Sequence, residues 1–219
     1  MAAALIVAAG SGERLGASGA KAFVTLAGKP MVQWSVDVFR SCELIDDIVV
    51  ALPPGRSRAP EGTIAVAGGA TRSESVKRAL AAAPRGGRPE YVFVHDAARP
   101  LVRPELLSML FACKDHADAV TAASPITDTV KRTGPECLAT ATIDREHLWA
   151  IETPQLFRGD VLARALDVPV SRLRAATDET SLVERAGGTT RVVQSPAFNL
   201  KVTWPQDLHL AELILGERG

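Results

Sequence analysis

The sequence predicts an α/β protein, in which a Rossmann-like, mostly parallel sheet is covered by helices on both faces and carries a projecting β-arm. Short apolar runs rich in β-branched residues alternate with segments of helical period along most of the 219 residues. Uniformly apolar strands separated by helices are typical of a parallel sheet buried on both faces. Residues 128–150 break this rhythm, because a Gly-Pro turn separates two β-prone runs there without helical period. We therefore expect a single domain, residues 1–219, with an arm at about 128–150.

The expected elements follow one another along the chain. The strands are short and apolar, and they cover Ala3–Ala8, Asp47–Leu52, Thr63–Ala67, Glu90–Val94, Ala119–Ala123 and Thr190–Gln194. The helices cover Pro30–Arg40, Thr71–Ala83, Pro104–Lys114, a segment after Gly159, a segment from Asp178, and Pro205–Leu215. Proline at the first turn favours the helix from Pro30. Thr71 with Glu74 three residues later is a capping-box pattern.

The composition argues against several classes of protein. Lys+Arg and Asp+Glu each number 25, so no global field attracts nucleic acid or an anionic membrane, and any recognition of phosphate must be local. No stretch reaches the ~18 apolar residues that span a bilayer. The opening apolar run lacks the basic residues of a secretory signal. Three widely spaced cysteines, Cys42, Cys113 and Cys137, fit free, buried thiols in a reducing cytoplasm.

The segment LIVAAGSGERLGASGAK, residues 5–21, has the composition of a phosphate-binding loop. It lacks the dinucleotide fingerprint, since Leu15 stands one residue before Gly16 where that pattern needs glycine. It is not a P-loop either, because Ala22 follows the lysine. Its glycines still let backbone N–H groups approach phosphate oxygens, and Arg14 and Lys21 add cationic donors. From the loop alone, a phosphate site and a tight turn with two solvated cations both remain open.

Further motifs extend along nearly the whole chain. In order they are AAGSGERLG with AKAFVTLAGKPMVQWSV, GGATRSESV (68–76), VHDAARP (94–100), DTVKR (128–132), DREHLW (144–149), TPQLF (153–157), TDETSLVE (177–184) and NLKVT (199–203). Together they resemble the 2-C-methyl-D-erythritol 4-phosphate cytidylyltransferase family of the non-mevalonate isoprenoid pathway. HDAARP, TPQ and TDE in this order are specific, whereas the loop alone is not. The resemblance implies that CTP and methylerythritol phosphate give a CDP-alditol and diphosphate, with Mg²⁺.

The resemblance also implies roles for the nucleotide half of the site. Arg14 and Lys21 match residues that stabilise the transition state around the triphosphate. Contacts with the nucleotide fall on Ala8, Ala9, Gly10, Gly12, Gly69 and Ser75. Asp96 ends a predicted strand at the edge where open α/β sheets bind ligands, and it matches the residue that contacts substrate and holds Mg²⁺. The alternative role for Asp96 is a helix N-cap.

For the alditol half, the resemblance assigns Thr129, Arg145 and Lys201 to the binding of methylerythritol phosphate, with Arg145 and Lys201 also in catalytic positions. Arg99 either reaches the substrate phosphate or locks its loop by pairing with a carboxylate. His95 is expected to be packed or hydrogen-bonded. Thr153, Thr177 and Asp178 are expected to support the site.

Some features of the sequence leave alternatives open. The resemblance implies a two-fold dimer with interlocking arms, so that Arg145 serves the partner's site.

The sequence departs at four positions from the residues common in the family: Val7, Ala20, Ala22 and Ala70. These departures put the rigidity of the loop and the selectivity for CTP in question. An enzyme for another polyol phosphate, such as ribitol 5-phosphate, and a non-catalytic nucleotide-binding homologue are the competing hypotheses.

Overall fold

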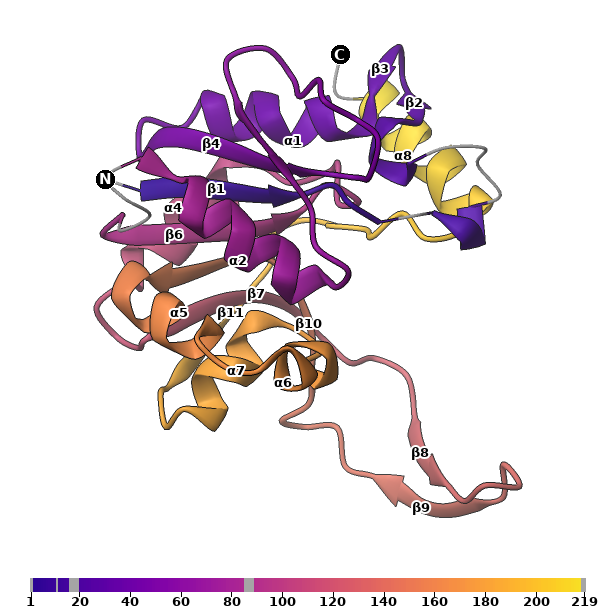
Figure 1. Cartoon of the computed structure of the whole chain (residues 1–219). Coiled ribbons are helices and arrows are strands. Elements are labelled where there is room, and N and C mark those ends of the chain that lie inside the picture. The colour runs from indigo at the N-terminus through magenta and orange to yellow at the C-terminus, as the bar shows by residue number, and fades with distance from the viewer. Residues whose placement is uncertain (1, 11, 16–19, 85–88, 218–219) are drawn as a thin grey trace.

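One seven-stranded sheet forms the centre of the computed structural model, which describes residues 2–10, 12–15, 20–84 and 89–217 (Figure 1). Ser11 and Gly16 of the opening loop lie outside the described residues. The strands stand in the order β11-β7-β10-β6-β1-β4-β5. Their bounds are β1 Ala2–Val7, β4 Ile45–Leu52, β5 Ile64–Ala67, β6 Tyr91–Asp96, β7 Ala119–Pro125, β10 Trp149–Arg158 and β11 Thr190–Gln194. All neighbours pair in parallel except β10, which lies antiparallel between β6 and β7.

Helices cover both faces of this sheet, as the sequence predicts. Alternate residues of β1 enter separate cores, with Ile6 on one face and Leu5 on the other. The first face is covered by α1 Met31–Arg40 and α4 Pro104–Ala112. The second is covered by α2 Arg72–Ala82, α5 Gly159–Leu166, α6 Val170–Ala175 and α7 Glu179–Arg185 (Figure 1). Within the described residues, every helix is too short or too polar to cross a bilayer.

Short elements connect the opening loop to the body. They are η1 Glu13–Leu15, η2 Lys21–Phe23, β2 Thr25–Leu26 and β3 Lys29–Pro30. The last helix, α8 Pro205–Gly216, packs against them in a third apolar cluster that includes Leu26 and Met31. Because this cluster also contains Leu15, it anchors that part of the loop to the body.

Three local expectations need correction. Pro30 is the N-cap of α1 and not its first residue. Thr71 Oγ1 accepts from Glu74 N at 3.2 Å, but Glu74 Oε2 accepts from Ala70 N, so only half of the capping box forms. Neither β10 nor α6 has a counterpart among the expected elements.

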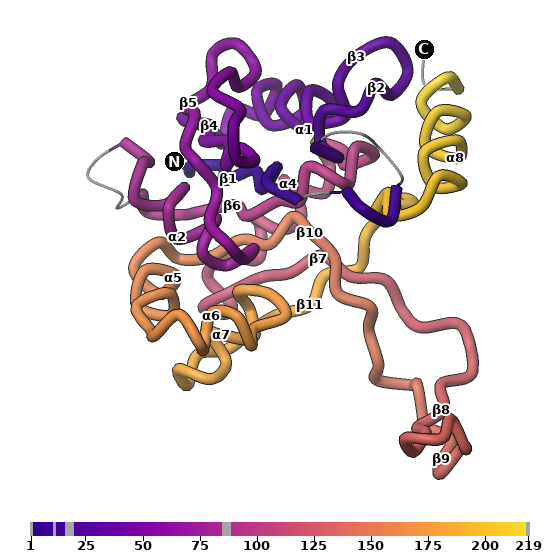
Figure 2. The backbone as a smooth tube through the Cα atoms, turned by 45° about the vertical axis from the view of Figure 1, so that its right-hand side comes forward, coloured from indigo at the N-terminus to yellow at the C-terminus, as the bar shows by residue number. Residues whose placement is uncertain are grey.

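The arm projects from the body as a two-stranded hairpin, β8 Val130–Thr133 and β9 Ala139–Ile143 (Figures 1 and 2). It is shorter than expected, since Trp149 and Ala150 already belong to β10 and pair with β7. Most of its side chains are exposed. Cys137 lies in its turn at a φ of 59° and is exposed, so the expectation that all three thiols are buried is wrong.

Candidate active site

The carboxyl ends of β1, β4, β5 and β6 meet at one edge of the sheet and line a cavity of about 890 Å³, here called the edge cavity. Its walls are formed by Ala8–Gly10 after β1, Pro53–Pro54 after β4, Gly69–Thr71 after β5, and Asp96 at the end of β6. Because all four strands run the same way, the loops that follow them meet at this edge. It is the position at which open α/β sheets bind ligands.

All the residues expected to contact the nucleotide line the edge cavity: Ala8, Ala9, Gly10, Gly12, Gly69 and Ser75, together with Arg14 and Lys21. Ser75 Oγ accepts from Gly69 N at 3.0 Å and donates to the Thr71 carbonyl at 2.9 Å, which ties the loop after β5 to the first turn of α2. A Cβ on Gly69 would lie 2.3 Å from Glu74 Cβ, so only glycine fits there.

Lys21 places an ammonium group with a lowered pKa in the lining of this cavity. Partial burial, and then the positive charges of Lys201 and Arg14, lower the pKa of Lys21 to about 8, although Asp96 and Asp207 oppose the shift. The nearby carboxylates thus balance the three cations only in part. Such a cluster favours a polyanionic ligand, because the ligand relieves the mutual repulsion of the cations. The Arg14 guanidinium lies 5.9 Å from the centre of the Trp204 ring at the start of α8.

Asp96 is the centre of an ion-pair network. Its Oδ1 accepts from Arg72 Nε at 2.8 Å and its Oδ2 from Lys201 Nζ at 2.7 Å. Burial alone would raise the pKa of the Asp96 carboxyl, but Arg72 and Lys201 hold it well below its usual range. The alternative role as a helix N-cap is wrong, since Asp96 ends β6 and Arg103 occupies the N-cap position of the next helix, α4.

Arg72 and Glu179 were not among the expected site residues. Arg72 also pairs with Glu179, whose carboxylate is fully buried and accepts from Ser73 Oγ at 2.9 Å. Burial opposes the charge on Arg72, but Glu179 and Asp96 raise its pKa above the ordinary value. Arg72 belongs to the motif GGATRSESV and Glu179 to the motif TDETSLVE. Because 107 positions separate them, no local sequence pattern predicts that they pair.

A second cavity of about 390 Å³, here called the side cavity, shares Arg72, Asp96 and Lys201 with the edge cavity. The expected residues Arg99, Thr153, Thr177 and Asp178 also line it. The two cavities therefore meet at one wall that carries two cations and one carboxylate. An anion in the side cavity would lie next to an anion in the edge cavity, with these cations between them.

Arg99 faces the side cavity and forms no ion pair with a carboxylate of the described residues. Its Nη1 donates to the backbone oxygen of Asn199 at 2.6 Å, and its Nε is buried with no hydrogen-bond partner in the described part of the chain. Burial lowers the pKa of Arg99, and the negative charges of Glu152 and Asp96 partly oppose that shift. The alternative in which Arg99 locks its loop through a carboxylate is therefore wrong.

His95 is packed inside the protein, as expected. It is fully buried, with Nε2 3.2 Å from both Ser35 Oγ and the Arg99 oxygen, and Nδ1 3.3 Å from Thr153 Oγ1. Burial lowers the pKa of His95 to about 3, so the ring is neutral at pH 7. Thr153 Oγ1 also accepts from Asp96 N at 3.0 Å, which supports the expected positioning role of Thr153.

The structure does not bring the arm residues to either cavity within one chain. Thr129 and Arg145 are exposed on the arm and are absent from the described residues that line the edge and side cavities. The arm extends away from the body in both views (Figures 1 and 2).

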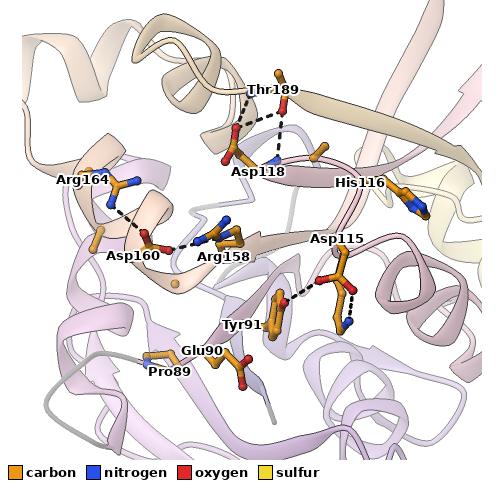
Figure 3. A pocket seen from close by; sticks show the side chains of 14 residues that line it. Pro89, Glu90, Tyr91, Asp115, His116, Asp118, Arg158, Asp160, Arg164 and Thr189 are labelled. Carbon is orange, nitrogen blue, oxygen red and sulfur yellow. Dashed lines mark hydrogen bonds and ion pairs between the residues drawn. The ribbon is translucent and has the colours of Figure 1, made fainter.

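A cavity of about 800 Å³ lies at the opposite edge of the sheet, between the start of β6 and the end of β10. Several of its charged side chains already have partners: Asp160 pairs with Arg164 and Arg158, and Asp115 pairs with Lys114 and accepts from the Tyr91 hydroxyl (Figure 3). All the site residues predicted from the sequence lie elsewhere among the described residues. The candidate site is therefore at the carboxyl edge.

Comparison with known proteins decides the family. A model of the family described as 2-C-methyl-D-erythritol 4-phosphate cytidylyltransferase matches residues 2–217. The chain is a member of the 2-C-methyl-D-erythritol 4-phosphate cytidylyltransferase family. The cytidylyltransferase of Symbiobacterium thermophilum is 44% identical over 220 residues, which cover 97% of this chain and 92% of that protein.

Solved structures of the cytidylyltransferase family have the same fold. The enzyme of Francisella tularensis matches with a TM-score of 0.82 at 30% identity, over 97% of this chain and 98% of that one. The enzyme of Thermus thermophilus matches with a TM-score of 0.79 at 31% identity, over the same shares. The predicted α/β fold and the predicted activity, a cytidylyltransferase of the non-mevalonate pathway, are both confirmed.

Proposed function

We propose that CTP binds in the edge cavity, that 2-C-methyl-D-erythritol 4-phosphate binds in the side cavity, and that the two phosphates react at the shared wall. The observation that carries this proposal is the wall itself. Arg72, Asp96 and Lys201 line both cavities, so the cations can face both phosphates at once. The products are 4-diphosphocytidyl-2-C-methyl-D-erythritol and diphosphate.

The chemistry suits the residues present. A phosphate monoester has a second pKa near 6, so the attacking oxygen is already ionised at pH 7 and needs no general base. The barrier is the approach of two anions and the charge that develops on the α-phosphate. Arg14 and Lys21 would stabilise that charge on the nucleotide side, and Lys201 on the side of the alditol phosphate. His95 is buried and neutral at pH 7, and this reaction needs no general base from it.

The donor set at Asp96 fits a divalent cation. Among the described residues, no group of three or more His, Cys, Asp or Glu side chains gathers around a possible metal position. Mg²⁺ is usually bound by one or two carboxylates together with phosphates and waters. Asp96 would hold the cation, which neutralises phosphate charge when bound. Lys201, whose side chain is 44% exposed, could leave Oδ2 and turn toward the alditol phosphate.

We also propose a homodimer in which the arm of one chain completes the site of the other. The exposed hairpin has no second layer of described residues to cover it, and a two-stranded ribbon is marginal alone. Thr129 and Arg145 would then contact the alditol phosphate in the partner's side cavity. A two-fold interface makes this exchange reciprocal.

A diphosphate-release assay tests the assignment of the cavities. With CTP and methylerythritol phosphate, we expect turnover that falls by ~10²–10³ in Lys21→Ala and Arg14→Ala, the usual effect of removing one donor to developing charge. Circular dichroism would show whether the variants remain folded. Folded variants with near-normal turnover would overturn the assignment. Preference for ribitol 5-phosphate would favour another polyol substrate, and CTP binding without turnover would favour a non-catalytic homologue.

A further inference from the structure

The buried polar atoms that lack a partner gather around the side cavity. Five such side-chain atoms occur among the described residues: Arg72 Nη2, Arg99 Nε, Gln155 Oε1, Thr190 Oγ1 and Asn199 Oδ1. Four of their residues line the side cavity. A buried polar group without a hydrogen bond is costly, so such a cluster indicates a polar occupant. The orphan atoms include both donors and acceptors, which matches a ligand with hydroxyl groups and anionic oxygens.

Gln155 is the best defined of these residues. It lies on β10, where it pairs with Val94 of β6 and Thr121 of β7, and it is 1% exposed. Nε2 donates to Asp178 Oδ2 at 2.8 Å. A carboxylate only accepts hydrogen bonds, so the amide cannot be turned over without placing two acceptors against each other. This contact therefore fixes Oε1 on the other side.

Asp178 is itself held in place. Its Oδ1 accepts from Ser181 N at 3.0 Å as the N-cap of α7, and its Oδ2 also accepts from Thr180 Oγ1 at 2.7 Å. With α7 as its anchor, Asp178 keeps the Gln155 amide in one orientation. Gln155 lines the side cavity. Its Oε1 is buried without a partner among the described residues, so it is a preorganised acceptor that only a donor can satisfy.

We propose that Gln155 is a specificity-determining residue of this enzyme, whose side-chain oxygen accepts a hydrogen bond from a hydroxyl group of the alditol. The inference rests on the proposal that the alditol phosphate occupies the side cavity. A site built to bond a substrate hydroxyl discriminates strongly against the analogue without it, because the buried acceptor is then left unpaired.

Gln155→Met tests this inference, since methionine has a similar length and volume but no acceptor for the hydroxyl. We expect KM for methylerythritol phosphate to rise by about 10–100-fold and KM for CTP to stay within about 3-fold, because one buried hydrogen bond is lost in the side cavity alone. The matched control is Gln33→Met. Gln33 Nε2 donates to Asp37 in the same way, at 2.7 Å, but on α1 and outside both cavities. Both kinetic constants should be unchanged in the control.

Monodeoxy analogues of methylerythritol phosphate separate a direct contact from a structural effect. Wild type should disfavour one of them by about 10-fold or more in kcat/KM, and Gln155→Met should lose most of that discrimination. An unchanged alditol KM, or discrimination that is the same in variant and wild type for every analogue, would overturn the proposal, since water would then satisfy Oε1. If wild type itself fails to turn over methylerythritol phosphate with CTP, the proposed function fails instead.

Discussion

If Lys21 binds the triphosphate of CTP as proposed, it does so well only while it is charged, and its environment makes that charge sensitive to pH. In the free enzyme burial and the charges of Lys201 and Arg14 lower its pKa to about 8. Below that pH the ammonium is ready for CTP, and above it the proton must first be taken up. We therefore expect kcat/KM for CTP, which reports ionisations of the free enzyme, to fall as the pH rises through about 8.

Lys21→Arg is the control for this pH dependence. A guanidinium stays protonated throughout the range, so the fall above pH 8 should disappear even if the maximal rate is lower. A wild-type profile that stays flat to about pH 9.5 would contradict the prediction, and the same fall in Lys21→Arg would assign the ionisation to another group.

At Asp96 we expect Asp96→Asn to lose Mg²⁺-dependent turnover and the binding of Mn²⁺, measured by electron paramagnetic resonance. Asparagine keeps an oxygen but not the charge that holds a dication. Stability should fall only modestly, because Glu179 still neutralises Arg72. Glu179→Gln acts on the same ion-pair network from the other end, so it should lower the melting temperature yet keep Mn²⁺ binding. Full turnover and unchanged Mn²⁺ affinity in Asp96→Asn would place the cation elsewhere.

Site residues that stand in a recognisable local sequence pattern were predictable from the sequence. Site residues whose place depends on partners far along the chain were not. Arg14 and Lys21 stand in a glycine-rich loop after a strand, and Asp96 ends a strand, so position along the chain indicated their place. Arg72 meets Glu179 from 107 positions away, and neither has a local pattern that marks it. Gln155 belongs to a motif that indicated the family without indicating that this residue lines a cavity.

Among the elements, the opening loop depends on close contact between Gly12 and Lys21. Gly12 has a φ of 75°, and an added Cβ would lie 2.7 Å from Lys21 Cβ and 3.1 Å from Lys21 Cα. Gly12→Ala therefore should displace Lys21 and reduce turnover, on the order of 10²-fold for a shift of about 1 Å. Diphosphate release measures this effect.

Gly28→Ala is the matched control, because Gly28 has a φ of 85° in the β2-β3 turn and open space around its Cβ position. The alanine carries the same backbone strain, so the free energy of unfolding, measured in urea, should fall by about 1–3 kcal/mol while turnover stays normal. Equal loss of turnover in both variants would mean that strain, and not the contact with Lys21, is responsible.

One strand of the central sheet, β10, was not predicted from the sequence. The buried strands β1, β4 and β6 carry continuous apolar runs, which the sequence displays directly. β10 contains a proline and the polar residues Glu152, Thr153 and Gln155, all buried. Glu152 is satisfied by Ser124, Ser195 and Asn199, which come from distant parts of the chain. A local pattern reads such a strand as a loop, because polar residues at core positions are explained only by tertiary partners.

In the whole molecule, the position of the arm determines whether one chain or two chains supply the residues of a site. In one chain Arg145 is exposed and is absent from the described residues that line the two cavities. The hairpin of the arm extends away from the body (Figure 1). If the proposed dimer forms, each site combines Lys21 of one chain with Arg145 of the partner subunit. Two variants that are each nearly inactive, Lys21→Ala and Arg145→Ala, should then complement one another.

Unfolding, mixing in equal amounts and refolding the two variants tests this arrangement. In a heterodimer with shared sites, one site carries both lesions and the other carries neither, so random pairing in an isologous dimer should restore roughly a quarter of wild-type activity. If Arg145 serves its own chain, every site in every dimer keeps one lesion and no activity returns. Differently tagged chains show by mass spectrometry whether heterodimers have formed. Heterodimers without activity would refute the shared site, and monomers throughout would refute the dimer.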